Sequence, residues 1–301
     1  MTNTIVAIPF DEELAEFIGK KGSENSITFY NRKFNNNTIV AIMPSSIEEK
    51  FYALPQCMLV ADQIIASTKS IDKLFGELLV ACSVLGKPVI FTKDNDITNL
   101  LSAIKIENYS FCDRDKLLDT IVAGKVANIS GQKRIDVDKA FNVKGVGTVV
   151  LGVVTKGIVK VHDTLYHNSG KPAGVRSLQS QDEDIKEAGP GTRVGIALKG
   201  IEDSEMKKGD ILSSVQTKSG RQLELDVKVS SFAKEAIETG KNYSIATGFS
   251  YSTAFVEEVN GTKVKLKLEK AICAEVSDRF MLVRAIAPRI FASGKILEIS
   301  A

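Results

Sequence analysis

Residues Ala140 to Gly157 read AFNVKGVGTVVLGVVTKG, and this stretch decides the fold of the chain. Small residues gather in GVG, and valine alternates with other residues on either side of it. Such a pattern predicts two strands joined by a tight turn, because glycine adopts the positive φ that tight hairpin turns require. From residue 132 onward, short alternating segments recur about every 8–12 residues, which is typical of all-β barrels and sandwiches.

The chain before residue 125 has a different pattern, in which strands alternate with helices. The expected strands are Thr4–Phe10, Ile27–Tyr30, Thr38–Met43, Met58–Ser67 and Val89–Thr92. The expected helices are 11–22 with Asp11 as its N-cap, 45–54, Ile71–Leu85, 97–106 and 113–123. This alternation favours an open, mostly parallel α/β sheet.

Length and composition point to a globular protein of two or three domains. The chain has 301 residues, of which 44% are hydrophobic and 25% are charged. No apolar run approaches the roughly 20 residues that cross a bilayer. The N-terminal MTNTIVAIPFDEE has no basic segment before its apolar residues, so we expect a first strand there and no signal peptide.

The residues that most often bind metals are sparse. Four cysteines without a CxxC pair favour a reducing cytoplasm over a disulfide framework or a zinc site. His162 and His167 flank one expected strand and should point to opposite faces of it, which disfavours a shared metal. We therefore expect neither a metal nor a cofactor.

The net charge of +2 is unevenly distributed along the chain. Residues 1–130 carry 13 Lys and Arg against 16 Asp and Glu, whereas residues 131–301 carry 26 against 21. The basic bias of the second half permits contact with phosphates. A solvated surface of mixed charge is the simpler explanation of the bias taken alone.

The change of pattern predicts three domains. We expect an α/β domain over residues 1–126, a β-barrel over 132–216 and a second β-barrel over 222–301. The segment Thr217–Gln222, TKSGRQ, is polar and contains glycine, and it is the expected boundary between the two β units. Asn260-Gly261 lies between two alternating runs and predicts a hairpin.

The region from Ala140 to Leu212 resembles domain 2 of the elongation factor Tu family. The matching pieces are AFNVKGVGTVVLGVVTKGIVKVHDTL, AGPGTRVGIALKG and KKGDIL, in the order that the family has. The region from Leu223 to Ile299 resembles domain 3 of that family in a shortened form. This shortened domain is more similar to the selenocysteine-specific factor and to initiation factor 2 gamma. The resemblance therefore implies a GTPase-like α/β domain followed by two β-barrels.

The GTPase motifs of that family are missing from the first 125 residues, which match it only in the order of elements. A nucleotide-binding loop of the form GxxxxGK[ST] wraps phosphates with glycine backbone, a lysine and a hydroxyl. This chain has PFDEELAEFIG instead, in which Pro9 removes a donor and the acidic residues 11–13 repel a phosphate. The DxxG motif has no match, and Thr92–Asn95, TKDN, replaces the guanine-reading NKxD. We therefore expect a degenerate domain, a pseudo-GTPase.

The resemblance also implies where RNA would bind. In this family domain 2 holds the 3′ end of aminoacyl-tRNA, and domain 3 contacts the acceptor or T stem. The RNA-binding candidates at matching positions are Lys144, Gly145, Gly147, Thr148, Arg176, Arg279 and Arg289.

A purely structural explanation stays open for each of these candidates. The two glycines would serve the turn alone, and Arg176 would lie on an ordinary solvated strand. Arg279 and Arg289 would pair with acids such as Glu275 or Asp278 between domains.

The expected function is that of a non-hydrolysing paralogue of elongation factor Tu. It would bind tRNA, or a ribosomal or translation-factor partner, through its barrels, and neither DNA nor a membrane. No constellation of catalytic residues is visible, so we do not expect an enzyme. One alternative is a protein-interaction scaffold that has lost tRNA binding. Another is an enzyme with a different ligand near Pro9–Glu13 or Thr92–Asp96, where open α/β sheets bind ligands.

Overall fold

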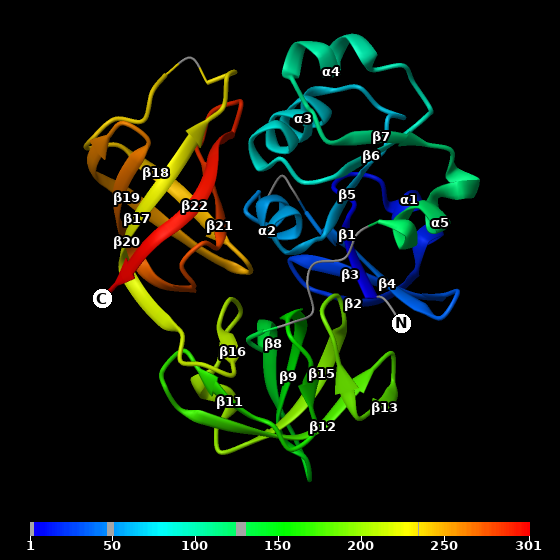
Figure 1. The fold of residues 1–301 in the computed structure, drawn as a ribbon, viewed down its shortest axis with the longest axis vertical. Helices are drawn as coiled ribbons and strands as arrows, with labels where there is room; N and C mark the ends of the chain where they lie inside the picture. The colour runs from blue at the N-terminus through cyan, green and yellow to red at the C-terminus, as the bar shows by residue number, and fades with distance from the viewer. Residues whose placement is uncertain (1–2, 47–50, 125–130, 234) are drawn as a thin grey trace.

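The computed structural model describes residues 3–46, 51–124, 131–233 and 235–301. It consists of an α/β domain (residues 3–123), a middle barrel (134–213) and a C-terminal barrel (218–300), each in contact with the other two (Figure 1). This architecture confirms the predicted α/β domain followed by two β-barrels.

The α/β domain is built on a mixed sheet with the strand order β2-β3-β4-β1-β5-β6-β7. Its strands are β1 (Asn3–Ala7), β2 (Lys20–Glu24), β3 (Ile27–Phe34), β4 (Asn37–Pro44), β5 (Gln63–Ala66), β6 (Val89–Thr92) and β7 (Tyr109–Cys112). Its helices are α1 (Glu12–Ile18), α2 (Ala53–Val60), α3 (Lys73–Leu85), α4 (Thr98–Ile104), the 3₁₀ turn η1 (Arg114–Lys116) and α5 (Leu117–Ala123). Strands β4, β1, β5, β6 and β7 are parallel, as expected, whereas β2 and β3 form an antiparallel edge.

Helices cover both faces of this sheet. One core cluster joins α2, α3 and α4 to one face, and a second joins α1 and α5 to the other. The first cluster continues into both barrels through Val153 of the middle barrel and through Phe249, Met281, Val283 and Ile290 of the C-terminal barrel. Because apolar burial is continuous across these boundaries, the three parts stabilise one another.

The predicted helices at 11–22 and Ile71–Leu85 are present, although the first ends at Ile18, and Asp11 is the cap that the sequence predicted. Asp11 caps α1, and its side chain accepts a hydrogen bond from the backbone N–H of Leu14 at 2.8 Å. Asp72 caps α3 in the same way, and Gly86 ends that helix in the left-handed conformation.

The predictions around α2 were wrong. The expected helix at 45–54 is displaced, because α2 begins at Ala53; residues 47–50 lie outside the described residues. The expected strand Met58–Ser67 includes the last turn of α2, and only its second part forms β5. Helix α2 is buried on nearly every side, and a fully buried helix has no apolar periodicity that separates it from a strand.

Short edge strands also escaped prediction. Lys20–Glu24, expected as a helix end, forms the fully exposed edge strand β2. The turn between β3 and β4 is confined to Asn35 and Asn36, which both have positive φ, so the residues before it belong to β3. The opposite edge strand β7 was not expected. Exposed edges carry little of the alternation that predicts a strand.

The middle barrel closes through pairing of β11 with β12 and has the order β11-β16-β8-β9-β15-β12, with β13 added beside β12. Its strands are β8 (Arg134–Val143), β9 (Gly147–Lys156), β10 (Val159–Lys160), β11 (Thr164–His167), β12 (Pro172–Ser180), β13 (Glu183–Ile185), β14 (Glu187–Ala188), β15 (Arg193–Lys199) and β16 (Ile211–Ser213). A 3₁₀ turn, η2 (Asp203–Glu205), precedes β16. The predicted hairpin of Ala140–Gly157 is formed by the end of β8 and all of β9.

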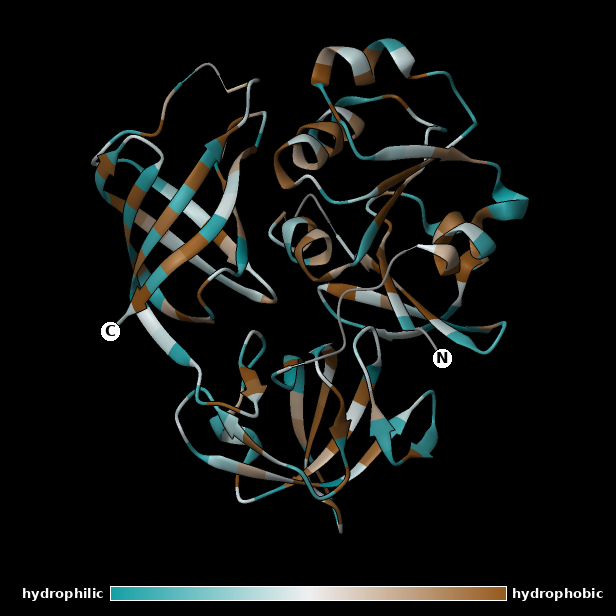
Figure 2. Cartoon of the chain, in the orientation of Figure 1, coloured by the Kyte–Doolittle hydropathy of each residue, from teal (hydrophilic) through white to brown (hydrophobic). Residues whose placement is uncertain are grey.

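The C-terminal barrel has the closed order β17-β20-β19-β18-β21-β22. Its strands are β17 (Lys218–Val229), β18 (Asn242–Thr247), β19 (Ser250–Asn260), β20 (Lys263–Ala274), β21 (Arg279–Val283) and β22 (Ile290–Ser300). Hydrophilic and hydrophobic residues alternate along its strands (Figure 2). The predicted hairpin at Asn260-Gly261 joins β19 to β20.

The predicted boundary at Thr217–Gln222 is part of a strand. Strand β17 begins at Lys218, and Gly220 pairs with Ile272 of β20. A Cβ at Gly220 would lie 2.1 Å from the carbonyl oxygen of Ser300. The glycine therefore permits close approach of two strands, which sequence alone does not distinguish from a linker.

Candidate nucleic-acid interface

The turn of the β8–β9 hairpin is built by two glycines. Gly145 has φ of +83° and Gly147 has φ of +93°, and a hydrogen bond from the N–H of Val146 to the carbonyl of Val143 closes the turn at 3.0 Å. L-residues with side chains rarely adopt these angles. The turn projects Val146, whose exposed fraction is 38%, and the exposed Lys144 into solvent.

Arg176 reaches this turn from strand β12, which is separated from β9 by β15. Its Nη1 donates a hydrogen bond to the carbonyl oxygen of Val146 at 2.8 Å, and Gly147 lies beneath the guanidinium. Thr148 instead faces the barrel interior, where its hydroxyl donates to the carbonyl of Ile201 at 2.8 Å. The structure thus places Lys144, both glycines and Arg176 together at the surface, and Thr148 beneath them.

Strand register creates an apolar strip on the outer face of the same barrel. Phe141 of β8 lies opposite Val149 of β9, which lies opposite Ala197 of β15. Leu151 of β9 lies opposite Gly195 of β15 in the adjacent row. Residues paired across antiparallel strands share a face, and Phe141, Val149 and Leu151 are only half-buried.

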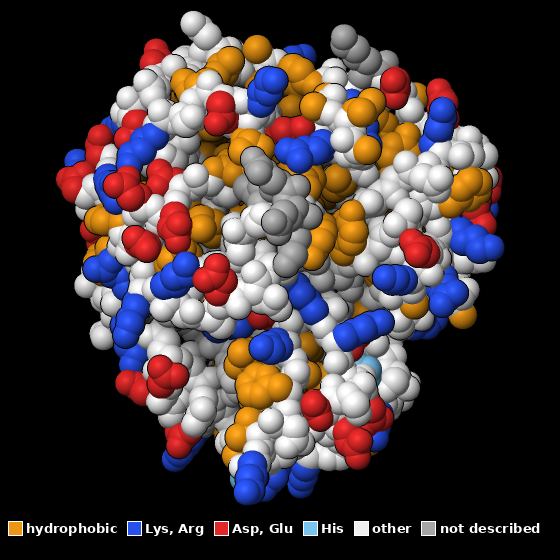
Figure 3. All heavy atoms as spheres, turned by 180° about the vertical axis from the view of Figure 1, so that it is seen from behind, with side chains coloured by type: hydrophobic (Ala, Val, Ile, Leu, Met, Phe, Trp, Pro, Cys, Tyr) orange, Lys and Arg blue, Asp and Glu red, His pale blue; other side chains and the backbone are white. Residues whose placement is uncertain are grey.

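Four cations surround this strip: Lys139, Lys144, Arg176 and Lys199. All four are exposed, and none forms an ion pair with a described residue; Lys139 lies over the ring of Phe141, 5.8 Å from its centroid. We call the strip and these cations the outer face of the middle barrel. Viewed from behind, hydrophobic side chains lie beside Lys and Arg over this barrel (Figure 3).

Sequence reasoning missed the apolar strip, with Phe141 among its residues, and two of the four cations, Lys139 and Lys199. The available signal was the alternation of β8, which places Lys139 and Phe141 on one side of the strand. Lys199 could not be found in this way, because only the pairing of β15 with β12, opposite Gly174, brings it to this face.

Arg279 and Arg289 lie elsewhere, between the C-terminal barrel and the α/β domain. Arg279 donates a hydrogen bond from Nη1 to the carbonyl oxygen of Leu85, at the end of α3. The guanidinium of Arg289 lies 3.7 Å from the ring centroid of Phe51 and within 3.5 Å of the carboxylate of Glu77. Neither residue is close to the hairpin, and neither pairs with the acids suggested by the sequence.

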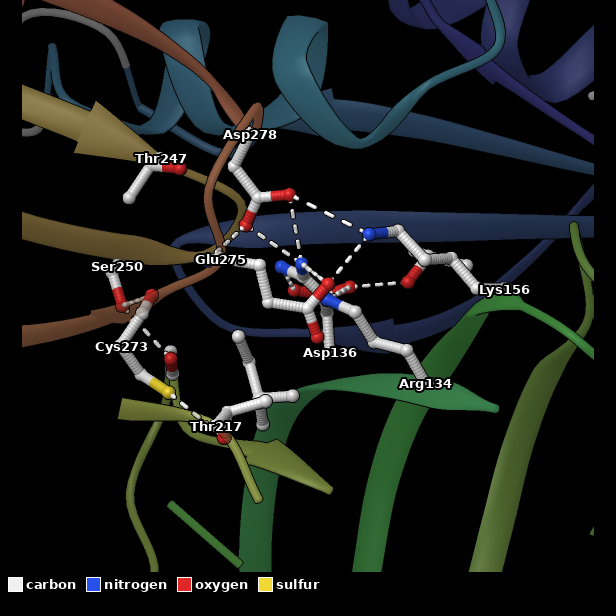
Figure 4. Close-up of polar contacts among 12 residues, drawn as sticks. Arg134, Asp136, Lys156, Thr217, Thr247, Ser250, Cys273, Glu275 and Asp278 are labelled. Carbon is white, nitrogen blue, oxygen red and sulfur yellow. Dashed lines mark hydrogen bonds and ion pairs between the residues drawn. The ribbon is translucent and has the colours of Figure 1, made fainter. Parts of the chain in front are cut away.

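Those acids, Glu275 and Asp278, join the two barrels instead. Asp278 accepts two hydrogen bonds from Nη1 of Arg134, at 2.6 and 2.9 Å, and Glu275 accepts one from Lys156 at 2.6 Å (Figure 4). Asp136 completes the cluster on the other side of Arg134, at 2.8 Å. Although burial opposes its charge, the surrounding carboxylates raise the pKa of Arg134.

Arg193, on β15 of the middle barrel, joins this barrel to the α/β domain. Its guanidinium lies 3.5 Å from the ring centroid of Phe29 in β3, and its Nη2 donates to Asp138 at 2.9 Å. Lys208 donates to the hydroxyl of Ser26 at 2.6 Å and lies 3.5 Å from the same carboxylate. Burial lowers the pKa of Lys208, and Asp138 opposes this shift. Arg193 lies two residues before Gly195 on β15, so the two residues share the outer side of the strand. The contacts of Arg193 with the α/β domain therefore cover the apolar strip at its Gly195 end.

The N-terminus of α1 is capped by the chain itself. The carboxylate of Asp11 accepts a hydrogen bond from the N–H of Leu14, and Glu12 and Glu13 follow in the first turn. The helix has seven residues, so its dipole adds little attraction for an anion. This geometry disfavours phosphate binding.

Two small cavities lie at this end of the parallel strands. One of about 270 Å³ is lined by Pro9, Asp11 and Lys69 among others, and one of about 130 Å³ by Lys69, Lys93 and Asp94 among others. The two lysines there form ion pairs: Lys69 with Glu13, and Lys93 with Asp113 at 2.7 Å. Arg114, which also lines the smaller cavity, donates to the carbonyl oxygen of Glu13 and lies over the ring of Phe17. These lysines therefore have little free charge to offer a ligand.

The described part of the chain offers neither a metal-binding cluster nor a membrane-spanning helix. It contains no group of three or more His, Cys, Asp and Glu side chains placed to hold a metal ion. None of its helices is long and apolar enough to span a bilayer. All four cysteines are free and buried.

Comparison with known proteins identifies relatives for part and for all of the chain. Residues 147–213 match the family described as elongation factor Tu domain 2. The uncharacterized protein MJ0325 of Methanocaldococcus jannaschii is 32% identical over 299 residues, which cover 95% of this chain and 96% of that protein. The selenocysteine-specific elongation factor of the same organism is 40% identical over 92 residues, 30% of this chain and 20% of that protein.

A solved structure shares the complete fold. The crystal structure of translation elongation factor SelB from Methanococcus maripaludis, in complex with the GTP analogue GppNHp, superposes with a TM-score of 0.82 at 22% identity. The match covers 100% of this chain and 80% of that one, so all three parts of the molecule are arranged similarly in both.

Proposed function

Since this chain belongs to the elongation factor Tu-like family of translation factors, we propose that it binds tRNA through the outer face of its middle barrel and neither binds nor hydrolyses GTP. It would be a cytoplasmic binding protein and not an enzyme.

The observation that carries this proposal is the set of unpaired cations around an apolar strip. A cation already paired with a carboxylate offers little net attraction to a phosphate, whereas Lys139, Lys144, Arg176 and Lys199 have no such partner among the described residues. Phe141 and Val149 supply the flat apolar surface on which an unpaired base stacks. This combination suits the single-stranded end of an RNA better than a duplex, because duplex RNA hides its base faces.

Our proposal that the chain does not bind GTP rests on the start of α1 and on the domain contacts. The carboxylates of residues 11–13 gather at the start of α1, where they would repel an approaching phosphate. The barrels are held against the α/β domain by Arg193, Arg289 and a shared apolar core. In a nucleotide-dependent switch, the bound nucleotide orders segments that set the contacts between domains. Here the side chains make these contacts without a nucleotide.

Neutralising the turn cations tests tRNA binding. We expect Lys144→Gln/Arg176→Gln to weaken binding of unfractionated tRNA about tenfold at 100 mM salt, and to reduce the salt slope of log K by about 1–2. The matched control is Lys93→Gln/Lys265→Gln, which removes two cations that are paired with acids. Fluorescence anisotropy with labelled tRNA provides the measurement.

An unchanged affinity in the turn variant would contradict the proposed interface. If wild-type protein retained no RNA at all but co-purified with a ribosomal protein or translation factor, the scaffold alternative would replace it. The nucleotide half of the proposal is tested separately by calorimetric titration with GTP and Mg²⁺, where micromolar binding would overturn it.

A further inference from the structure

A cavity of about 390 Å³ lies where the three parts of the molecule meet. The α/β domain lines it with Asp62 and Lys87, the middle barrel with Arg134 and Lys156, and the C-terminal barrel with Asp278 and Arg279. Apolar residues, including Ile5, Val60 and Val154, form the rest of the wall. Its size falls within the range of small-molecule sites.

The cations on the barrel side of the cavity are fully engaged. Arg134 is held by Asp136 and Asp278, and Lys156 donates to Glu275, as Figure 4 shows. These two cations face three carboxylates, so this side offers nothing to a further anion.

Lys87 and Arg279 are different, because neither forms an ion pair with a carboxylate of the described residues. The Nζ of Lys87 donates to the carbonyls of Leu59 at 2.5 Å and Ala61 at 2.6 Å, and so caps the end of α2. Arg279 has one hydrogen bond, to the carbonyl of Leu85, two residues before Lys87. Arg279 is exposed, and this is its one hydrogen bond within the described chain, so its other guanidinium N–H groups are open to solvent or to a ligand.

The two cations repel each other. Burial lowers the pKa of Lys87 to about 7, the Asp62 carboxylate opposes this shift, and the Arg279 guanidinium adds to it. Asp62 is itself engaged, since it accepts a hydrogen bond from the N–H of Ile5 at 2.8 Å. An anion between Lys87 and Arg279 would relieve this repulsion and use the free donors of both side chains.

We propose that the cavity binds a small oxyanion, a phosphate monoester or a carboxylate, between Lys87 and Arg279. The bound anion links the end of α3 and the start of β6 to β21, and so fastens the α/β domain to the C-terminal barrel. This site is separate from the outer face of the middle barrel, and it holds or fails independently of tRNA binding.

The site has a defined pH dependence. The groups that face Lys87 are Asp62 from its own domain and Arg279 from the C-terminal barrel. Across the cavity lie four further charged groups: Arg134, Asp136, Lys156 and Asp278. Only protonated Lys87 attracts the anion, so affinity is highest below pH 7 and falls as the pH rises through 7. From about pH 6.5 to about pH 8.5 the protonated fraction of Lys87, and with it the affinity, falls about 25-fold.

Calorimetric titration of the intact protein with sodium sulfate tests the proposal, since the charge of sulfate is constant over this pH range. Sodium chloride at equal ionic strength is the reference. We expect saturable binding that weakens at least tenfold in Arg279→Gln and is largely kept in Arg279→Lys. The matched control is Lys160→Gln, an exposed cation paired with Glu187, which should bind as the wild type does.

Three results would overturn the proposal. Absence of saturable binding would exclude the site, and equal affinity in Arg279→Gln would show an adventitious ion only. Affinity that does not change with pH would exclude Lys87 as a ligand. Titration with glucose 6-phosphate and with citrate then separates phosphate esters from carboxylates.

Discussion

The outer face of the middle barrel and the strand-end edge of the α/β domain, where Lys69 and Lys93 follow the parallel strands β5 and β6, both carry cations. The two regions differ in whether those cations form ion pairs. On the middle barrel Lys139, Lys144 and Lys199 have no carboxylate partner among the described residues. At the strand-end edge Lys69 pairs with Glu13, and Lys93 with Asp113. The number of cations therefore says little about phosphate binding. What matters is whether the chain has already neutralised them.

The largest effect should come from removing all the unpaired cations at once. We expect Lys139→Gln/Lys144→Gln/Arg176→Gln/Lys199→Gln to reduce tRNA affinity about 100-fold at 100 mM salt. Each cation that is removed lowers the number of counterions released from the RNA on binding. Filter binding over a salt series measures this. Thermal unfolding of the variant serves as the control, and an equal affinity would mean that RNA does not bind there.

A smaller loss is expected when the aromatic surface is removed. Phe141→Ala should weaken tRNA binding about tenfold, since stacking of one base on an aromatic ring contributes about 1–3 kcal/mol. Unlike the cation variants, it should leave the salt slope unchanged. Phe141→Leu keeps the apolar contact and Phe141→Tyr keeps the ring, so only the tyrosine variant should bind normally. If the leucine variant matched it, stacking would not be involved.

At the strand-end edge the expected effect is on stability. Asp11→Ala removes the cap of α1 and should lower the free energy of unfolding by about 1 kcal/mol. Asp11→Asn keeps a capping oxygen and should cost less. Urea denaturation measures both changes. tRNA affinity should be unaltered, and a clear loss of binding in either variant would show that this edge also contacts RNA.

The smallest effect should follow neutralisation of a paired cation. We expect Lys93→Gln to change tRNA affinity less than about twofold, because Asp113 already offsets its charge and exposed ion pairs contribute little. Lys144→Gln, measured beside it, removes one charge of the same sign from the outer face and should weaken binding several-fold. Equal effects of the two variants would remove the distinction between these regions.

Much of the fold could be predicted from local sequence. Gly145 and Gly147 specify the β8–β9 turn, since few other residues adopt their backbone angles. The failures fall where local patterns carry no information. Helix α2 is buried on nearly all sides, and Gly220 serves a close approach between strands that lie far apart in the sequence.

Some residues of the candidate site could be predicted from the sequence, and others could be found only from the packing of the strands and domains. Lys144 and Arg176 could be proposed from the hairpin and the family resemblance, and Asp11 could be recognised as a cap. Lys199 joins the outer face only through the pairing of β15 with its neighbours. Arg279 was a candidate for RNA contact, yet packing of the C-terminal barrel against α3 turns it toward Leu85 and the central cavity.

Turns and caps were thus readable from the chain alone, because each depends on residues within a few positions of one another. Which charges remain free was decided only by the tertiary structure. Lys93 and Lys144 look alike in the sequence, but one meets Asp113 from a distant segment and the other meets solvent. Electrostatic pairing depends on distance in space, and that distance is set when the three parts of the molecule pack together.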